Sequence, residues 1–338
     1  MTQSVSEKTA MITGVNGQDG SYLADLLISK GYRVIGLKRR TSSISTSRVD
    51  HLYNQQDPLL KCPSFKMHYY DLSDGSAVFH LLDKYKPSEF YNLAAQSHVA
   101  VSFEVPEYTS EGIAGGTLKI LEAIRTVSPK TRFYQASSSE MYGDSTNCGP
   151  NGFTEESRML PVSPYAVAKL HAHHMTRVYR EAYGIHASSG ILFNHESPRR
   201  GETFVTRKIT MAAARIKMGL QKKLLLGNLD AKRDWGYAGD YVKAMWLMLQ
   251  QPVADDYVVA TGKTHTVREF LEVVFDHAGL GNYQDYVEFD PRLTRPNEVP
   301  YLLGDSTKAR TILKWEPTCD MTKLARMMYD HDLVTLMK

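Results

Sequence analysis

Short apolar segments alternate with amphipathic segments along the first 193 residues of the chain. Residues 9–13 form an apolar run that stops at Gly14, and residues 21–30 then place apolar side chains at the three- and four-residue spacing of a helix. Gly31 stands where the end of that helix is expected. This succession predicts a buried strand, a tight turn and a helix.

The same alternation continues through five more strands and three more helices. Apolar runs predict strands at 33–37, 65–70, 90–93, 132–136 and 187–193. Helical spacing predicts helices at 75–85, 111–125 and 165–183. Strands that alternate with helices indicate βαβ units, so we predict an α/β fold with a Rossmann-type, doubly wound parallel sheet.

Charged and polar loops interrupt this alternation after residue 194. The helices that we expect beyond it span 205–218, 238–250, 267–278 and 321–333. We interpret the change as a smaller domain interleaved with the sheet. The predicted division places a Rossmann domain at 1–193 and 236–262, and the smaller domain at 194–235 and 263–338.

Composition narrows the class of protein. The chain has 338 residues, of which 42% are hydrophobic and 23% charged, values that exclude a disordered protein. Its 40 basic and 37 acidic residues are too balanced for a nucleic-acid binder. No stretch approaches the ~18 apolar residues that cross a membrane, and we expect neither a signal peptide nor membrane attachment.

Cysteine usage favours a reducing compartment. The three cysteines, Cys62, Cys148 and Cys319, form no CxxC pair. They fit neither a disulfide framework nor a zinc site, so we expect a cytoplasmic protein without a metal centre.

A glycine-rich turn carries the first chemical signal. Gly14, Gly17 and Gly20 form a GxxGxxG pattern between the first predicted strand and helix. Glycines there permit a tight turn and let backbone N–H groups approach a pyrophosphate at the helix N-terminus. In this context the pattern indicates a dinucleotide site, although a tight turn without a ligand is the alternative.

The residues after the second predicted strand favour NADP. An NAD site usually carries a carboxylate there for the ribose 2′-OH, whereas this chain has Arg39, Arg40 and the hydroxyl of Ser43. Guanidinium groups suit a 2′-phosphate because they offer paired donors. A solvated basic turn is the alternative.

Two further strand ends face the same edge of the predicted sheet. Asp71 follows the third strand, where its carboxylate would accept from an adenine amino group or cap the next helix. Ala94 and Ala95 follow the fourth strand. Their small size allows close approach of a ligand, although they also suit plain packing.

A tyrosine and a lysine carry the second signal. Tyr165 and Lys169 lie four residues apart on one face of a predicted helix that opens with Pro164. A nearby ammonium favours the phenolate, which helps a tyrosine of pKa ~10 to act as a base. Ser138 and Glu140 follow a strand end upstream. They are candidates for supporting a reacting hydroxyl and for acid–base chemistry, or else for capping a helix.

Together these motifs resemble the extended short-chain dehydrogenase/reductase family and, within it, the GDP-mannose 4,6-dehydratases. The resemblance covers nearly the whole chain. The segment 193–208 is typical of these dehydratases and separates them from sugar epimerases. Two departures are visible: Ser138 stands where the family usually has threonine, and the loop 145–160 differs.

The resemblance implies a role for each catalytic candidate. Tyr165 would take the proton of the sugar C4 hydroxyl while a hydride passes to NADP, and Lys169 would hold the nicotinamide ribose and lower the pKa of Tyr165. Ser138 would support the developing 4-ketone. Glu140 would remove the C5 proton and help water to leave from C6, after which the hydride returns to C6. The product would be GDP-4-keto-6-deoxymannose.

The resemblance also implies two sets of binding residues and a homodimer or homotetramer. The cofactor set is Gly14, Asn16, Gly17, Gln18, Asp19, Gly20, Arg39, Arg40, Ser43, Asp71, Leu72, Leu93, Ala94, Ala95, Ser97, Tyr108, Lys169, His195 and Arg200. The GDP-mannose set is Ser97, Asn194, Val205, Lys208, Arg233, Arg292, Arg295 and Glu298. For any single arginine of the second set, a surface salt bridge is the alternative.

Other enzymatic and non-enzymatic functions are the alternatives at this level. A nucleotide-sugar epimerase or reductase would share the glycine turn, Ser138, Tyr165 and Lys169, but would not need Glu140. A dehydratase could also reduce its own product to GDP-rhamnose with free NADPH. A non-enzymatic NADP sensor is disfavoured because it would not need all four side chains. A dTDP-glucose dehydratase would show an Asp-Glu pair where this chain has Ser139 and Glu140.

Overall fold

The computed structural model describes residues 8–52, 64–143, 145, 148–293, 297 and 299–337. The chain forms two compact units, each built from separate stretches of sequence. The first unit comprises the described residues of Met1–Ser138, Ser163–Ile191 and Val242–Tyr257. The second comprises those of Ser139–Val162, Leu192–Tyr241 and Val258–Lys338. The sequence pattern placed 139–162 with the Rossmann part, whereas the described residues of this segment pack with the second unit.

A seven-stranded sheet, most of whose residues belong to the first unit, has the order β11-β6-β5-β4-β1-β2-β3. Its strands are β1 (Thr9–Thr13), β2 (Arg33–Lys38), β3 (Phe65–Tyr69), β4 (Glu89–Asn92), β5 (Arg132–Ser138), β6 (Ala187–Leu192) and β11 (Asp256–Val259). The pairings from β3 across to β5 are all parallel. Chain order runs outward from β1 to β3 and then resumes at β4 on the other side of β1. The carboxyl ends of β1 and β4 therefore form the switch point at which ligands bind in doubly wound sheets.

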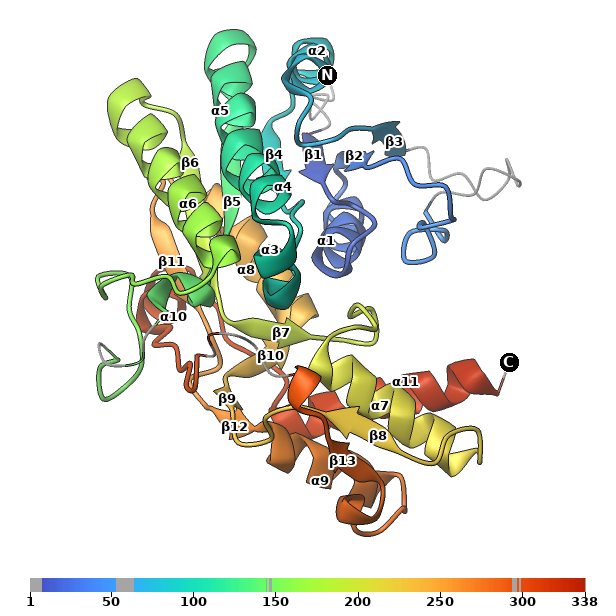
Figure 1. The fold of residues 1–338 in the computed structure, drawn as a ribbon. Coiled ribbons are helices and arrows are strands. Elements are labelled where there is room, and N and C mark those ends of the chain that lie inside the picture. Colours follow the sequence, from blue (N-terminus) through green and yellow to red (C-terminus); the bar gives the residue numbers. More distant parts are fainter. Residues whose placement is uncertain are drawn as a thin grey trace. The chain divides into compact units, whose positions relative to one another are not determined.

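Helices flank this sheet on both faces, as in a doubly wound fold. They are α1 (Gln18–Ser29), α2 (Gly75–Tyr85), α3 (Val99–Glu104), α4 (Pro106–Ser110), α5 (Gly116–Val127), α6 (Pro164–Tyr183) and α8 (Ala238–Gln250). A π-helical turn, Glu111–Gly115, leads into α5. Helices α2, α5 and α6 lie side by side (Figure 1). The apolar side chains of α2 and α5, such as Val78, Leu82 and Ile120, fill one core with residues of the strands.

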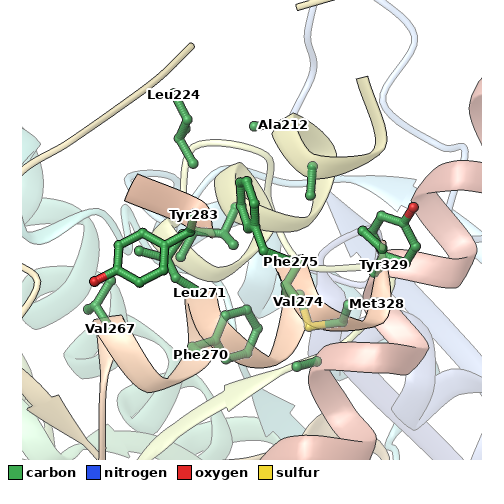
Figure 2. Packing of buried hydrophobic residues seen from close by; sticks show 14 of the residues in the cluster. Ala212, Leu224, Val267, Phe270, Leu271, Val274, Phe275, Tyr283, Met328 and Tyr329 are labelled. Carbon is green, nitrogen blue, oxygen red and sulfur yellow. The ribbon is translucent and has the colours of Figure 1, made fainter. Parts of the chain in front are cut away.

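The second unit has its own apolar core. Its helices are α7 (Val205–Lys217), α9 (Val267–His277), α10 (Thr307–Ile312) and α11 (Met321–Leu336). Figure 2 shows Phe270, Phe275 and Met328 packed between helices of this unit. Three short pairs of strands complete it: β7 (Asn194–Glu196) with β10 (Trp235–Tyr237), β9 (Lys232–Arg233) with β12 (His265–Thr266), and β8 (Leu224–Leu226) with β13 (Val287–Phe289).

The predicted α/β class and doubly wound sheet are confirmed. The expected strand at 9–13 and the expected helices at 75–85 and 238–250 have the observed bounds. Helix α1 begins at Gln18, three residues before the expected start, and the sequence pattern missed the short elements of the second unit. In the part of the chain that the structure describes, we find no helix with the length and apolarity needed to cross a membrane.

Candidate active site

The glycine turn between β1 and α1 is shaped by contacts that leave no room for side chains. Gly14 has a φ of +66°, and a Cβ on it would lie 3.1 Å from the Cα of Ala94. A Cβ on Gly20 would lie 2.3 Å from the carbonyl oxygen of Gly14. Gly17, the N-cap residue of α1, has no side chain with which to cap the helix. The turn therefore offers the helix N-terminus to an anion, and it fits the pyrophosphate of a dinucleotide.

A threonine that the sequence analysis missed joins this turn to the end of β4. The Thr13 hydroxyl accepts hydrogen bonds from the backbone N–H groups of Leu93 (2.9 Å) and Ala94 (3.0 Å). It donates in turn to the side-chain oxygen of Asn92 (2.9 Å). Two of the predicted cofactor residues are thus held beside Gly14 at the switch point of the sheet. The signal that could have identified Thr13 in the sequence is a hydroxyl side chain at the end of the first apolar run.

The basic residues after β2 lie on the surface of the first unit. The Arg39 guanidinium donates to the Tyr108 hydroxyl, so two members of the predicted cofactor set meet across 69 positions of sequence. The Asn16 amide donates to the Ser45 carbonyl (2.9 Å), which ties the glycine turn to the loop that follows Arg40.

The carboxylate of Asp71 stands at the end of β3. It accepts from the backbone N–H of Ser73 (3.0 Å) and from the Ser73 hydroxyl (2.7 Å). These bonds, with a smaller contribution from Arg39, hold the pKa of Asp71 below its usual range. The next helix is capped by Asp74, which accepts from the backbone N–H of Ala77 (2.9 Å). The helix-cap alternative for Asp71 is therefore wrong.

Helix α6 presents Tyr165 and Lys169 from one buried face. Ser163 caps the helix by accepting from the backbone N–H of Ala166 (3.1 Å), and Pro164 occupies its first turn. The Lys169 Nζ lies 5.8 Å from the centroid of the Tyr165 ring. Burial lowers the pKa of Lys169 to about 8, although the Asp19 carboxylate opposes the shift. The ammonium form still predominates at neutral pH.

The end of β5 lies against the same helical face. The Lys169 ammonium donates to the carbonyl of Ala136 (2.8 Å), two residues before Ser138. Ser138 ends β5, and Glu140 follows in a 3-10 turn, Ser139–Tyr142. The side chains of Ser138 and Glu140 are both buried. In the first unit the structure therefore brings Tyr165 and Lys169 to the strand end that carries Ser138.

The second unit holds two of the predicted cofactor residues, His195 and Arg200. The Nδ1 of His195 lies 2.8 Å from the Phe193 carbonyl, and its ring stacks on Tyr241 at 4.6 Å. Because a carbonyl only accepts, Nδ1 carries the proton of the neutral ring and Nε2 is an acceptor. The Arg200 Nε lies 3.0 Å from a carboxylate oxygen of Glu196.

The predicted GDP-mannose residues are more scattered. Asn194 lies in β7, Val205 and Lys208 in α7, and Arg233 is buried in β9. Ser97 is exposed in the first unit. Arg295 and Glu298 lie outside the residues that the structure describes.

Arg292, another member of the predicted GDP-mannose set, pairs with a carboxylate of the protein. Its Nη2 lies 2.7 Å from the Oδ2 of Asp290, which is the salt bridge considered as the alternative. Asp234, which the sequence analysis did not single out, is fully buried and accepts from the backbone N–H groups of Thr261 and Gly262 (2.9 Å each). It anchors the chain directly after Arg233.

A doubly wound sheet with a glycine turn at its switch point, and a Tyr-x-x-x-Lys pair beside the end of β5, define an extended short-chain dehydrogenase/reductase. The family model for GDP-mannose 4,6 dehydratase matches residues 11–328, and the chain belongs to this family.

Individual proteins are similar to this chain in sequence or in fold. GDP-mannose 4,6 dehydratase 1 of Arabidopsis thaliana is 55% identical over 330 residues, which cover 96% of this chain and 90% of that protein. The UDP-glucose 4-epimerase of Thermus thermophilus in complex with NAD superimposes with a TM-score of 0.79 at 26% identity, covering 96% of this chain and 98% of that one. RMD from Pseudomonas aeruginosa, complexed with NADPH, has a TM-score of 0.79 at 23% identity, covering 97% and 99%, and shows the fold alone.

Proposed function

We propose that this chain is a GDP-mannose 4,6-dehydratase, a hydro-lyase that converts GDP-mannose to GDP-4-keto-6-deoxymannose and water. The match of residues 11–328 to the dehydratase family carries the proposal. The four buried side chains Ser138, Glu140, Tyr165 and Lys169 support it. An epimerase or simple reductase would need three of them but would have no use for Glu140 beside Ser138.

The proposed cofactor is a nicotinamide dinucleotide, and specifically NADP. The glycine turn fits a pyrophosphate, and structural neighbours carry NAD or NADPH. Arg39 and Arg40 stand where an NAD site would carry a carboxylate. When bound, the nicotinamide would supply a reversible hydride acceptor, so that oxidation at C4 and reduction at C6 together involve no net redox change.

Tyr165 is the proposed base for the sugar C4 hydroxyl. The Lys169 ammonium, 5.8 Å from the ring centroid, favours the phenolate that this role requires. Lys169 is itself held by the Ala136 carbonyl, so its charge has a fixed place relative to the end of β5. The Ser138 hydroxyl, at that strand end, donates to the developing 4-ketone.

Glu140 is the proposed acid–base group for the loss of water. A ketone at C4 makes the C5 proton acidic, so a carboxylate can remove it only after C4 has been oxidised. The carboxylic acid formed in this way then gives the same proton to the hydroxide that leaves C6. One side chain therefore completes the elimination of water without a net gain or loss of protons. The return of the hydride to C6 also requires a proton at C5, and the proton that Tyr165 took from the C4 hydroxyl balances it.

We further propose that the second unit contributes cations for the nucleotide diphosphate. Lys208, Arg233 and Arg292 are the candidates, since two phosphates require several cationic donors. Arg292 would exchange Asp290 for phosphate as its partner. A cytoplasmic homodimer or homotetramer is the proposed state of the enzyme.

An isotope experiment tests the proposed function. The purified chain, supplied with NADP, is incubated with GDP-mannose that carries deuterium at C4, and the product is identified by NMR and mass spectrometry. The expected product is GDP-4-keto-6-deoxymannose with deuterium at C6. Unchanged substrate, a C4 epimer, or loss of the label to solvent would contradict the proposal.

A further inference from the structure

A buried histidine with no part in the proposed chemistry lies one helical turn beyond Lys169. His173 follows Tyr165 and Lys169 at four-residue intervals, so all three share one face of α6. Its Nδ1 lies 3.1 Å from the hydroxyl of Ser137, and its Nε2 lies 3.9 Å from a carboxylate oxygen of Asp256. His173 and Ser137 are only 4% and 3% exposed.

This serine, histidine and aspartate do not form a hydrolytic triad. The Asp256 carboxylate is engaged by the Arg180 guanidinium through two hydrogen bonds of 2.9 and 2.8 Å. The 3.9 Å distance from Asp256 to the ring exceeds that of a hydrogen bond. Ser137 lies within strand β5, where burial keeps its hydroxyl away from any substrate. The role of Ser137, His173 and Asp256 is therefore to support the structure or to position other residues.

The protonation state of the His173 ring determines whether its Nδ1 accepts a hydrogen bond from the Ser137 hydroxyl or donates one to it. Burial lowers the pKa of His173 to about 4, so the ring is neutral at physiological pH. The Asp256 carboxylate faces Nε2 and favours the tautomer with its proton there. Nδ1 is then an acceptor, and the Ser137 hydroxyl donates to it.

Two consecutive contacts thus join α6 to the end of β5. Lys169 donates to the carbonyl of Ala136, and His173 accepts from the side chain of Ser137. Ser138 is the next residue along the strand, and Tyr165 is one turn before Lys169 along the helix. We propose that His173 is a positioning residue that sets Ser138 against Tyr165, the two groups that must meet the same sugar hydroxyl. The inference rests on the proposed function.

The kinetic test compares three substitutions. His173→Leu removes the acceptor, whereas His173→Asn retains one close to the place of Nδ1. We expect His173→Leu to lower kcat about 10-fold or more with the KM for GDP-mannose changed by less than about 2-fold, because a small misplacement of reacting groups slows the reaction strongly. His173→Asn should recover kcat to within about 3-fold of the parent. Ser137→Ala should lower kcat as His173→Leu does, and the double variant should be no slower than the slower single variant.

A matched control separates positioning from a general loss of core packing. His186 is half-buried, and its Nε2 lies 2.9 Å from the Gln251 carbonyl. It adjoins the amino end of β5, because the Phe133 N–H donates to its carbonyl. His186→Leu should leave kcat within about 2-fold of the parent. Equal losses of kcat in His186→Leu and His173→Leu, or additive losses in the Ser137 and His173 double variant, would overturn the proposal.

A second measurement does not depend on turnover. Nitrogen NMR of chain labelled at histidine should show His173 with its proton on Nε2, and Ser137→Ala should shift the Nδ1 resonance. An Nδ1 resonance that Ser137→Ala does not move would refute the contact and the positioning role with it. If the parent does not convert GDP-mannose while the NMR result holds, the failure belongs to the proposed function and not to the contact.

Discussion

Glu140 and Tyr165 are both buried, yet the proposed reaction uses them at different steps. Tyr165 acts when C4 is oxidised, and Glu140 acts only afterwards. Glu140→Gln should therefore bind GDP-mannose and develop the absorbance of reduced nicotinamide, and then stall, with turnover lower by ~10²–10⁴. Rapid-scanning absorbance with product analysis measures both effects.

Tyr165→Phe is the matched comparison, because it removes only the hydroxyl that is proposed to act in the first step. This variant should show no reduced nicotinamide at all. The two variants should therefore differ in the step at which the reaction stops, as well as in the loss of turnover. Turnover of Glu140→Gln within a few-fold of the parent would reduce Glu140 to a capping residue and favour an epimerase or reductase.

Two exposed arginines should set the choice of cofactor. Arg39 and Arg40 follow β2 where a carboxylate would serve NAD. We expect the chain to bind NADP at least ~10-fold more tightly than NAD, which corresponds to ~1.4 kcal/mol. Replacing both arginines by alanine should bring the two dissociation constants close together, as measured by calorimetric titration.

The control for this experiment is Arg125→Ala. Arg125 is also exposed, but it pairs with Glu122 on α5 (2.8 Å) and lies on a helix instead of a strand end. Arg125→Ala should leave the ratio of the dissociation constants for NADP and NAD unchanged. Equal affinities for NADP and NAD in the parent chain would show that the basic turn is merely solvated.

Helix α1 packs so closely on the glycine turn that one methyl group should displace it. A Cβ on Gly20 would meet backbone atoms, the Gly14 oxygen at 2.3 Å and the Val15 Cα at 2.6 Å. Gly20→Ala should therefore weaken nucleotide binding at least ~10-fold and cost about 1–3 kcal/mol of unfolding free energy. Titration with NADP and urea unfolding measure the two quantities.

Gly112 provides the matched control, since a Cβ there would meet nothing within 4 Å. Gly112→Ala should leave nucleotide binding unchanged and should stabilise the chain by up to about 1 kcal/mol, because alanine is the better helix former. If both alanine variants behave alike, close packing of the turn does not explain the need for glycine.

Helix α6 should make the stability of the chain depend on pH. Burial lowers the pKa of His173 from 6.5 to about 4; Asp256 opposes the shift, while His174, Arg180 and Arg177 add to it. Between these pH values the unfolded chain binds a proton that the folded chain does not. The free energy of unfolding should therefore fall by about 3 kcal/mol as the pH falls from about 6.5 to about 4.

Urea unfolding at pH 7 and pH 4.5 measures this loss. His173→Leu lacks the titrating ring, so its stability should fall less over the same range than that of the parent. The control is His80→Leu, at an exposed position of α2, which should keep the parent's pH dependence. A His173→Leu variant with the full pH dependence would assign the effect to other groups.

At the scale of the whole molecule, each of the two units has an apolar core of its own among the residues that the structure describes. Phe270 is fully buried in the second core, between helices (Figure 2). Phe270→Ala should lower the free energy of unfolding by about 3–5 kcal/mol, because it removes a large buried ring and leaves a cavity. Thermal and urea unfolding measure the change.

Phe289 in β13 is the control, since 66% of its side chain is exposed. Phe289→Ala should change the unfolding free energy by less than about 0.5 kcal/mol. Similar losses in the two variants would contradict the assignment of Phe270 to a packed core.

At this scale the sequence pattern and the structure agree best where the signal is local. The apolar run 9–13 and the helix 75–85 could be predicted because period and capping act within a few residues. The pairs β9–β12 and β7–β10 could not, because strands of two or three residues carry no periodicity. The π-helical turn before α5 was hidden inside a continuous helical pattern.

In the candidate site, too, the features set by local sequence could be predicted and those set by tertiary packing could not. Sequence spacing alone placed Tyr165 and Lys169 on one helical face, and the glycine pattern alone indicated a turn that side chains would block. Only the tertiary structure decided that β4 lies beside β1, that Thr13 holds Leu93, and that His173 faces Ser137. Local patterns depend on the 3.6- and 2-residue periods of the backbone, which any segment carries by itself. Contacts between residues 36 or 80 positions apart depend on which elements pack together, and the chain settles that only when it folds.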